Sequence, residues 1–132
     1  MVSRVFVDSS ALLTLLDRAD ARHDAARLCL LGLADADLVT HGYVVAESLA
    51  VARRRFGVDG AVALIDGLLP AIDVVAVEPA VHAAAMARYR DSLPSGTSFV
   101  DQVSLELMTR ESIETAFVFD ADFATAGIQV IP

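Results

Sequence analysis

Short apolar runs alternate with helical stretches along the whole chain, and no other feature of the sequence constrains the fold as strongly. Runs with the length and composition of buried strands occur at residues 4–7, 37–40, 74–77, 116–119 and 128–131. Stretches with helical periodicity, capping residues or flanking Gly and Pro occur at residues 11–16, 21–34, 43–56, 59–69, 80–90, 98–110 and 122–126. Strands that alternate with helices favour a parallel sheet with helices on both faces. We therefore predict an α/β fold, a three-layer α/β/α domain with a central, mostly parallel sheet.

Two of the expected helical regions carry finer predictions. Gly57 ends the helix expected over residues 43–56, so a second, separate helix is expected to follow it. The helix expected over residues 21–34 has an apolar side that we expect to face the core. This side consists of Ala25, Leu28, Cys29 and Leu33.

The length and composition limit the class of protein. A chain of 132 residues, of which 55% are hydrophobic, suits one globular domain over residues 1–132 and excludes a disordered chain. Its longest run without a charged residue, 123–132, is about half as long as a membrane-spanning helix, and its start lacks the features of a secretory signal. Cys29 is the only cysteine, so no internal disulfide can form. We expect a cytoplasmic protein with no membrane partner.

The charged residues are mostly acidic, and they are drawn largely from two residue types, Asp and Arg. The formal net charge is −8, which argues against nonspecific adhesion to nucleic acids. All ten basic residues are Arg, whose planar fork suits phosphates and carboxylates. Thirteen of the eighteen acidic residues are Asp, which is typical of helix caps, turns and metal sites rather than of helix surfaces. Some of these Asp residues are therefore expected to have specific positions.

Acidic side chains follow two of the expected strands directly. Asp8 comes after the first strand and Asp120 after the fourth, with Asp122 two positions later. Since parallel strands that lie centrally in one sheet end at the same edge, we expect Asp8 and Asp120 to lie close together there. The alternative interpretation is that Asp8 and Asp122 serve only as helix N-caps.

Glu47 lies on the interior side of its expected helix. Val44 and Val51, three positions before it and four after it, share its stripe. A carboxylate that faces the core requires a cation or an ion pair. A buried ion pair with an Arg is therefore the alternative to a metal site at this position.

Asp101 has two interpretations that the sequence leaves open. Ser98 and Asp101 have the spacing of a capping box, so the carboxylate can simply close the start of a helix. Leu105 and Met108, however, continue its stripe and direct it inward, where Ser104 is placed to steady it. The histidines at 23, 41 and 82 show no metal-binding spacing, and we expect them to be structural or solvated.

The four carboxylates together are stronger evidence for a metal site than any one of them alone. Two carboxylates about 4 Å apart repel by about 4 kcal/mol at an effective dielectric constant of about 20. The four acids Asp8, Glu47, Asp101 and Asp120 therefore share a cleft only if protons or cations neutralise them. A site with oxygen ligands alone favours Mg²⁺ or Mn²⁺, which activate water for attack on a phosphodiester. The residues predict a divalent-metal phosphodiesterase.

Four segments of the chain resemble, in order and spacing, the motifs of PIN-domain ribonucleases. They are Phe6-Val-Asp-Ser-Ser-Ala-Leu-Leu13, Val45-Ala-Glu47, Ser98-Phe-Val-Asp-Gln102 and Val118-Phe-Asp-Ala-Asp-Phe123. The size and the motif near the end of the chain resemble the VapC toxins of bacterial toxin–antitoxin pairs. The resemblance covers the whole chain and implies a PIN-like fold.

The resemblance implies a role for each acid. It implies that Asp8 and Asp101 hold Mg²⁺ or Mn²⁺ and that Glu47 and Asp120 complete the catalytic set. Asp122 is implied as an accessory metal ligand. Ser9 resembles the family residue whose hydroxyl orients the first carboxylate. Ser98 and Ser104 are expected to support the acids without binding the metal themselves.

The resemblance also implies partners. The expected substrate is RNA, typically a tRNA or a ribosomal RNA loop, and a small VapB-like antitoxin is expected to place a basic side chain in the cleft. A homodimer is expected. Candidate RNA contacts are Arg53, Arg54, Arg55, Arg88 and Arg90. Gln102 departs from the resemblance, because a small residue is common directly after the third acid.

The alternative to a ribonuclease is a catalytically inactive PIN-like binding module.

Overall fold

A single sheet of five parallel strands forms the middle of the molecule. The computed structural model describes residues 3–132. The strands are β1 (Arg4–Val7), β2 (Asp37–His41), β3 (Asp73–Val75), β4 (Thr115–Phe117) and β5 (Gln129–Ile131). Their order in the sheet is β3-β2-β1-β4-β5, and every neighbouring pair is parallel. The predicted α/β fold with a parallel sheet is confirmed.

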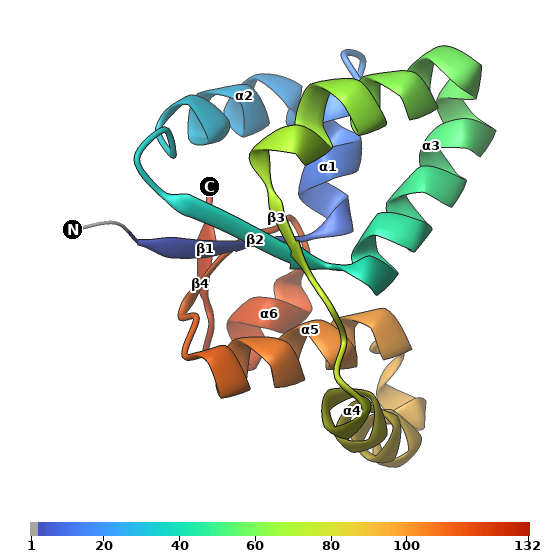
Figure 1. The fold of residues 1–132 in the computed structure, drawn as a ribbon, viewed down its shortest axis with the longest axis vertical. Helices are drawn as coiled ribbons and strands as arrows, with labels where there is room; N and C mark the ends of the chain where they lie inside the picture. The colour runs from blue at the N-terminus through green and yellow to red at the C-terminus, as the bar shows by residue number, and fades with distance from the viewer. Residues whose placement is uncertain (1–2) are drawn as a thin grey trace.

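Helices cover both faces of this sheet. They are α1 (Ser9–Leu16), α2 (His23–Leu31), α3 (Gly42–Val62), α4 (Pro79–Asp91), α5 (Phe99–Glu111) and α6 (Ala121–Thr125). Short π- or 3₁₀-helical turns follow at Ala63–Leu68, Leu69–Ala71 and Leu93–Ser95. Figure 1 shows α1, α2 and α3 on one side of the sheet and α4, α5 and α6 on the other. This is the three-layer arrangement that the sequence predicts.

The predicted break at Gly57 is present. Gly57 has φ 73° and ψ −161° inside α3, a conformation with positive φ that glycine adopts without steric cost. The helix changes direction sharply along its course (Figure 1). The segment before Gly57 carries Glu47, and the segment after it turns back over α1.

The core explains why the first strand is so apolar. β1 lies at the centre of the sheet, and Val5, Phe6 and Val7 are all buried because both faces of β1 are covered. The rings of Phe6 and Phe123 stack at 6.3 Å between centroids, which ties α6 to the central strand. No helix within residues 3–132 is long and apolar enough to span a membrane.

The apolar side predicted for α2 is half wrong. Cys29 and Leu33 pack against the core as expected, but Ala25 and Leu28 are exposed, and Ala26 is the fully buried residue. The helix begins only at His23, whose Nδ1 lies 2.9 Å from the carbonyl oxygen of Thr14. This contact joins the start of α2 to α1, and the local sequence pattern does not reveal it.

Candidate active site

Two acids meet where neighbouring strands end. Val7 of β1 pairs with Phe117 of β4, and the backbone N–H of Asp8 donates to the carbonyl oxygen of Phe117 at 3.1 Å. Asp120 follows three residues after Phe117 and begins α6. The two strand ends that the sequence predicts to be neighbours are therefore adjacent at one edge of the sheet.

Asp8 is buried and only half satisfied. Its Oδ2 accepts hydrogen bonds from the backbone N–H of Ser10 at 3.0 Å and from the Ser10 hydroxyl at 2.7 Å. Its Oδ1 is buried with no hydrogen-bond partner among residues 3–132. Burial, more than any neighbouring group, raises the pKa of this carboxyl group. An unpaired buried carboxylate oxygen of this kind is suited to a cation.

Asp101, Asp120 and Asp122 form a cluster beside it. One carboxylate oxygen from each lies within 4.8 Å of the others. Burial raises the pKa of Asp101 to about 7, and the charges of Asp8 and Asp120 add to this effect. Asp122 is exposed at the rim. None of the ion pairs within residues 3–132 includes Asp101, so no Arg offsets these effects there.

The helix caps at this edge differ in part from the sequence-based alternative. Asp8 caps α1 as proposed, but Asp120, and not Asp122, caps α6, because the backbone N–H of Asp122 donates to Asp120 Oδ1 at 2.9 Å. Ser98 caps α5 by accepting from the backbone N–H of Asp101 at 3.0 Å. No reciprocal bond from the Ser98 N–H to the Asp101 carboxylate occurs in the described chain. Capping therefore leaves the Asp101 carboxylate available to a ligand.

Glu47 is half-buried and reaches the site through a hydroxyl. Ser9 Oγ donates to Glu47 Oε1 at 2.6 Å, and the charge of Glu47 contributes to the raised pKa of Asp8. None of the ion pairs in residues 3–132 includes Glu47, so the alternative of a buried ion pair with an Arg is wrong. Ser9 thus orients Glu47, whereas Ser10, which the sequence analysis missed, orients Asp8.

Ser104 does not steady Asp101. Its hydroxyl lies 2.9 Å from His41 Nε2 and donates to the carbonyl oxygen of Val100 at 3.0 Å. His41 Nδ1 in turn accepts from the first backbone N–H groups of α3. Burial lowers the pKa of His41 to about 4, so it is a neutral, structural histidine, as expected. Ser104 joins α5 to α3 and does not touch the acids.

The acids fit a divalent cation. The donor set consists of carboxylate oxygens, which hard divalent ions prefer. Each ion pair in the described part of the chain uses an acid outside the site: Glu111, Asp20, Asp17 or Glu106. The unpartnered Asp8 Oδ1, and the absence of these acids from the ion pairs of residues 3–132, leave the cluster to be neutralised by protons or by a bound cation.

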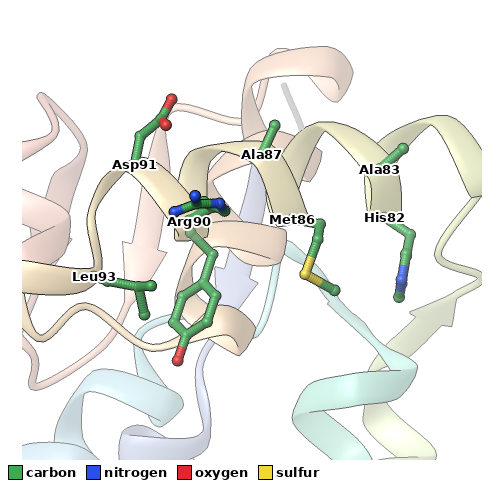
Figure 2. Close-up of a pocket in the computed structure, with 8 residues that line it drawn as sticks. His82, Ala83, Met86, Ala87, Arg90, Asp91 and Leu93 are labelled. Carbon is green, nitrogen blue, oxygen red and sulfur yellow. The ribbon is translucent and has the colours of Figure 1, made fainter.

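The predicted RNA-contacting arginines lie in different surroundings. Arg88 pairs with Glu106 at 3.1 Å and shares a cavity with Asp122 of the acidic cluster. Arg55 pairs with Asp17 at the far end of α1 from Asp8. Arg90 lines a larger cavity of about 760 Å³ on α4, shown in Figure 2. Arg53 and Arg54 are exposed on α3.

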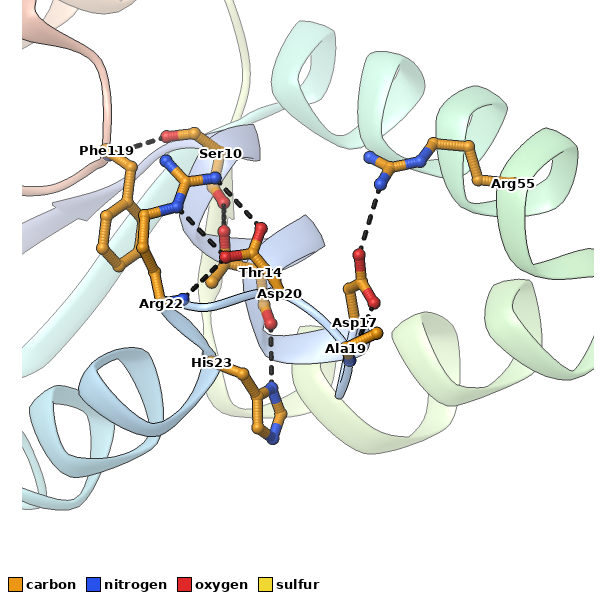
Figure 3. Close-up of polar contacts among 9 residues, drawn as sticks. All are labelled: Ser10, Thr14, Asp17, Ala19, Asp20, Arg22, His23, Arg55 and Phe119. Carbon is orange, nitrogen blue, oxygen red and sulfur yellow. Dashed lines mark hydrogen bonds and ion pairs between the residues drawn. The ribbon is translucent and has the colours of Figure 1, made fainter.

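Arg22 lies near the site and was missed from the sequence. Its guanidinium stacks over the Phe119 ring at 4.8 Å and is held there by Asp20, 3.1 Å away (Figure 3). The backbone N–H of Phe119 donates to Ser10 Oγ, the same hydroxyl that contacts Asp8. Because Phe119 lies far from Arg22 in sequence, no local pattern indicates this placement.

Comparison with known proteins gives a consistent result. The family described as PIN domain matches residues 5–128. The 23S rRNA-specific endonuclease VapC20 of Mycobacterium tuberculosis is 30% identical to this chain, over 97% of the chain and 98% of that protein.

Solved structures extend the comparison. The crystal structure of M. tuberculosis VapC20, described as a Sarcin-Ricin loop cleaving toxin, matches with a TM-score of 0.86 and covers 97% of this chain and 99% of that one. VapBC2 from Rickettsia felis, bound to a DNA fragment from its promoter, matches with a TM-score of 0.73 at 11% identity, covering 96% of each chain. FitAcB from Neisseria gonorrhoeae matches with a TM-score of 0.73 at 17% identity, covering 97% of this chain and 96% of that one. The last two share the fold.

Proposed function

This chain belongs to the PIN-domain family, and on that premise we propose that it is a metal-dependent endoribonuclease, the toxin of a type II toxin–antitoxin pair. One observation carries the proposal: among residues 3–132, the acids at the edge of the sheet are gathered without an Arg partner, and Asp8 Oδ1 is buried and unpaired. Mutually repelling carboxylates in one cleft require protons or cations, and a donor set of oxygen atoms favours a divalent cation. A cation held this way can activate a water molecule for attack on a phosphodiester.

The acids divide into two groups. Asp8, Asp101 and Asp120 are the residues we assign to Mg²⁺ or Mn²⁺, with Asp122 as an accessory ligand at the exposed rim. Glu47 completes the catalytic set from α3. When bound, the ion supplies a water of lowered pKa and neutralises charge on the scissile phosphate. No covalent intermediate with the protein is required.

The supporting residues hold these acids in place. Ser10 donates to Asp8 Oδ2, which leaves Oδ1 free for the ion, and Ser9 fixes the carboxylate of Glu47. Ser98 fixes the first turn of α5, where Asp101 lies. We assign Arg22 and Arg88 to the RNA phosphates at the rim, since both lie beside residues of the site.

The substrate proposed is the sarcin–ricin loop of 23S rRNA. The support is VapC20, the 23S rRNA-specific endonuclease that is 30% identical over 97% of this chain. The partner proposed is a small VapB-like antitoxin with a basic side chain that neutralises the acidic cleft. A homodimer is the proposed assembly.

The test is cleavage of bacterial ribosomes and total RNA by the purified, antitoxin-free protein in Mg²⁺ or Mn²⁺. We expect discrete fragments whose ends map to the sarcin–ricin loop, and none with EDTA or with Asp101→Asn. Fragments from another RNA would keep the nuclease and replace the substrate. A folded protein that cuts no RNA would favour the inactive binding module instead.

A further inference from the structure

A small cavity adjoins the acidic cluster. It has a volume of about 280 Å³ and lies between α4, α5 and α6. Asp122 belongs both to its wall and to the acidic cluster, and Thr97 Oγ1 lies 3.4 Å from Asp122 Oδ2. A group that occupies this cavity therefore lies next to whatever phosphate the acids act upon.

Gln102, on the wall of this cavity, has a buried side-chain oxygen that forms no hydrogen bond with residues 3–132. The residue is 6% exposed, and its Nε2 donates to Ser92 Oγ at 3.2 Å. Its Oε1 is buried without a partner in the part of the chain that the structure describes. A buried acceptor without a partner is rare and destabilising, which indicates that a donor completes it in the working molecule. The last torsion of a Gln side chain is broad, so the amide can turn toward a ligand in the cavity.

The walls of the cavity suit a nucleobase. Leu105 and Ala126 supply apolar surface, while Gln102 and Thr97 supply polar groups at its edge. Arg88 also lines the cavity, and Glu106 holds its guanidinium at 3.1 Å. Apolar faces with a few polar groups are what a flat base that has left its stack requires.

The larger cavity on α4 does not compete for this role. It is lined by one helix and the residues just after it, including the exposed Met86 and Leu93 (Figure 2). It shares no residue with the acidic cluster, and nothing in the structure shows what covers it.

We propose that the cavity of Gln102 is the subsite for one nucleobase beside the cleaved bond, and that it selects a base with an exocyclic amino group. The amine donates to Gln102 Oε1, which supplies the missing partner and holds the neighbouring phosphate at the acids. This inference rests on the proposed nuclease function. Gln102 is then a specificity-determining residue: it binds the base and so positions the RNA, and it takes no part in the chemical step.

The test deletes one amine at a time from the RNA. Synthetic hairpins of the cleaved loop carry purine riboside for adenosine, inosine for guanosine or 2-pyrimidinone riboside for cytidine, at each position flanking the cut. The value of kcat/KM for each is measured against the parent hairpin in one competition reaction. The enzyme forms are the unchanged protein, Gln102→Met and Gln129→Met. Gln129 is exposed on β5 and bonded to Thr115, so it is a matched control outside the site.

We expect one flanking position at which amine deletion lowers kcat/KM at least tenfold with the unchanged protein and with Gln129→Met. Gln102→Met keeps the side-chain volume. With this variant, amine deletion at the same position is expected to lower kcat/KM less than threefold. Ala126→Phe fills the cavity from its exposed side and is expected to abolish the same preference, which covers the case that Gln102→Met folds poorly.

Equal ratios for the unchanged protein and both cavity variants would overturn the subsite while leaving the nuclease intact. The absence of any flanking position sensitive to amine deletion would overturn it as well. A protein that cuts none of the hairpins and no natural RNA would instead refute the proposed function on which the subsite rests.

Discussion

Carboxylates on this chain occur in two contrasting surroundings. Asp20 lies at the surface with its side chain partly exposed, and its hydrogen bonds with Arg22 lower its pKa to about 2. Glu106 lies between Arg88 and Arg110, at 3.1 and 2.8 Å, and its pKa is lowered mainly by Arg110. Asp101, by contrast, has a pKa raised to about 7, because burial and two neighbouring acids oppose its charge.

The difference follows from which acids the arginines pair with. Every ion pair within residues 3–132 lies outside the acidic cluster. Figure 3 shows two such pairs, Asp20 with Arg22 and Asp17 with Arg55. A carboxylate paired with Arg is neutralised by the protein itself, whereas the carboxylates of the cluster are left to an external ion. Acidic residues thus form surface ion pairs in one region, and in the other they are the residues that we assign to the metal ion.

The largest expected effect separates the two kinds of acid by activity. Asp101→Asn is expected to lower RNA cleavage about a thousandfold or more, because a lost metal ligand removes several kcal/mol of transition-state stabilisation. Asp17→Asn, in an Arg pair, is the matched control and is expected to change cleavage less than about twofold. Initial rates on the same RNA measure both. Comparable losses in the two variants would erase the distinction between paired and unpaired acids.

The second prediction concerns pH in the absence of metal. The ordinary pKa of Asp101 is 3.8 and its folded value is about 7, so between these values the folded state holds a proton that the unfolded chain has lost. The free energy of unfolding therefore falls as the pH rises from about 4 to about 7. We expect a loss of about 1–2 kcal/mol, after allowing for solvent screening of a half-buried group.

Urea unfolding in EDTA at pH 5 and pH 8 measures this loss. Asp101→Asn is expected to flatten the dependence, and a divalent cation at pH 8 is expected to restore the stability. A metal-free protein that is more stable at pH 8 than at pH 5 would contradict the unpaired state of the cluster.

The third prediction separates capping from ligand binding within one helical turn. Ser98→Ala is expected to lower the free energy of unfolding by about 1 kcal/mol, because the Asp101 N–H loses its acceptor. Asp101→Asn is expected to leave the metal-free protein as stable or more stable, since repulsion falls. Thermal unfolding of the two variants in EDTA compares them. If Asp101→Asn were the more damaging change, the carboxylate would be a structural cap after all.

The smallest expected effect compares two arginines. Arg88→Met is expected to raise KM for RNA about threefold, because its charge lies beside Asp122 and the cleft. Arg55→Met, which breaks an exposed pair at the far end of α1, is expected to change neither KM nor stability measurably. Steady-state kinetics at two salt concentrations distinguish them, because a phosphate contact makes KM more sensitive to salt. An equal response of the two would remove Arg88 from the RNA path.

Local patterns predicted the fold well, and they predicted that Asp8 and Asp120 follow neighbouring strands of the sheet. The apolar run of β1 and the Asp that follows it were readable because a central strand needs apolar residues on both faces. The break at Gly57 was readable because only that residue type tolerates the turn easily. Both signals depend on residues close together in the sequence.

Contacts between distant segments were not readable. Ser9 and Ser10 are neighbours of the same type, and only the three-dimensional structure shows that one serves Glu47 and the other Asp8. Ser104 was expected beside Asp101 and instead contacts His41, which lies 63 residues away. The rotation of α2 and the place of Arg22 depend on tertiary contacts in the same way.

The pairing of β1 with β4 has a consequence for synthesis. Ser10 and Phe119, which join the two strand ends through a hydrogen bond, lie 109 residues apart. A chain that grows from its N-terminus carries Asp8 out of the ribosome early, but the site is complete only when Asp120 has emerged as well. During most of its translation, the nascent chain therefore lacks the means to cut RNA, including that of the ribosome that is making it.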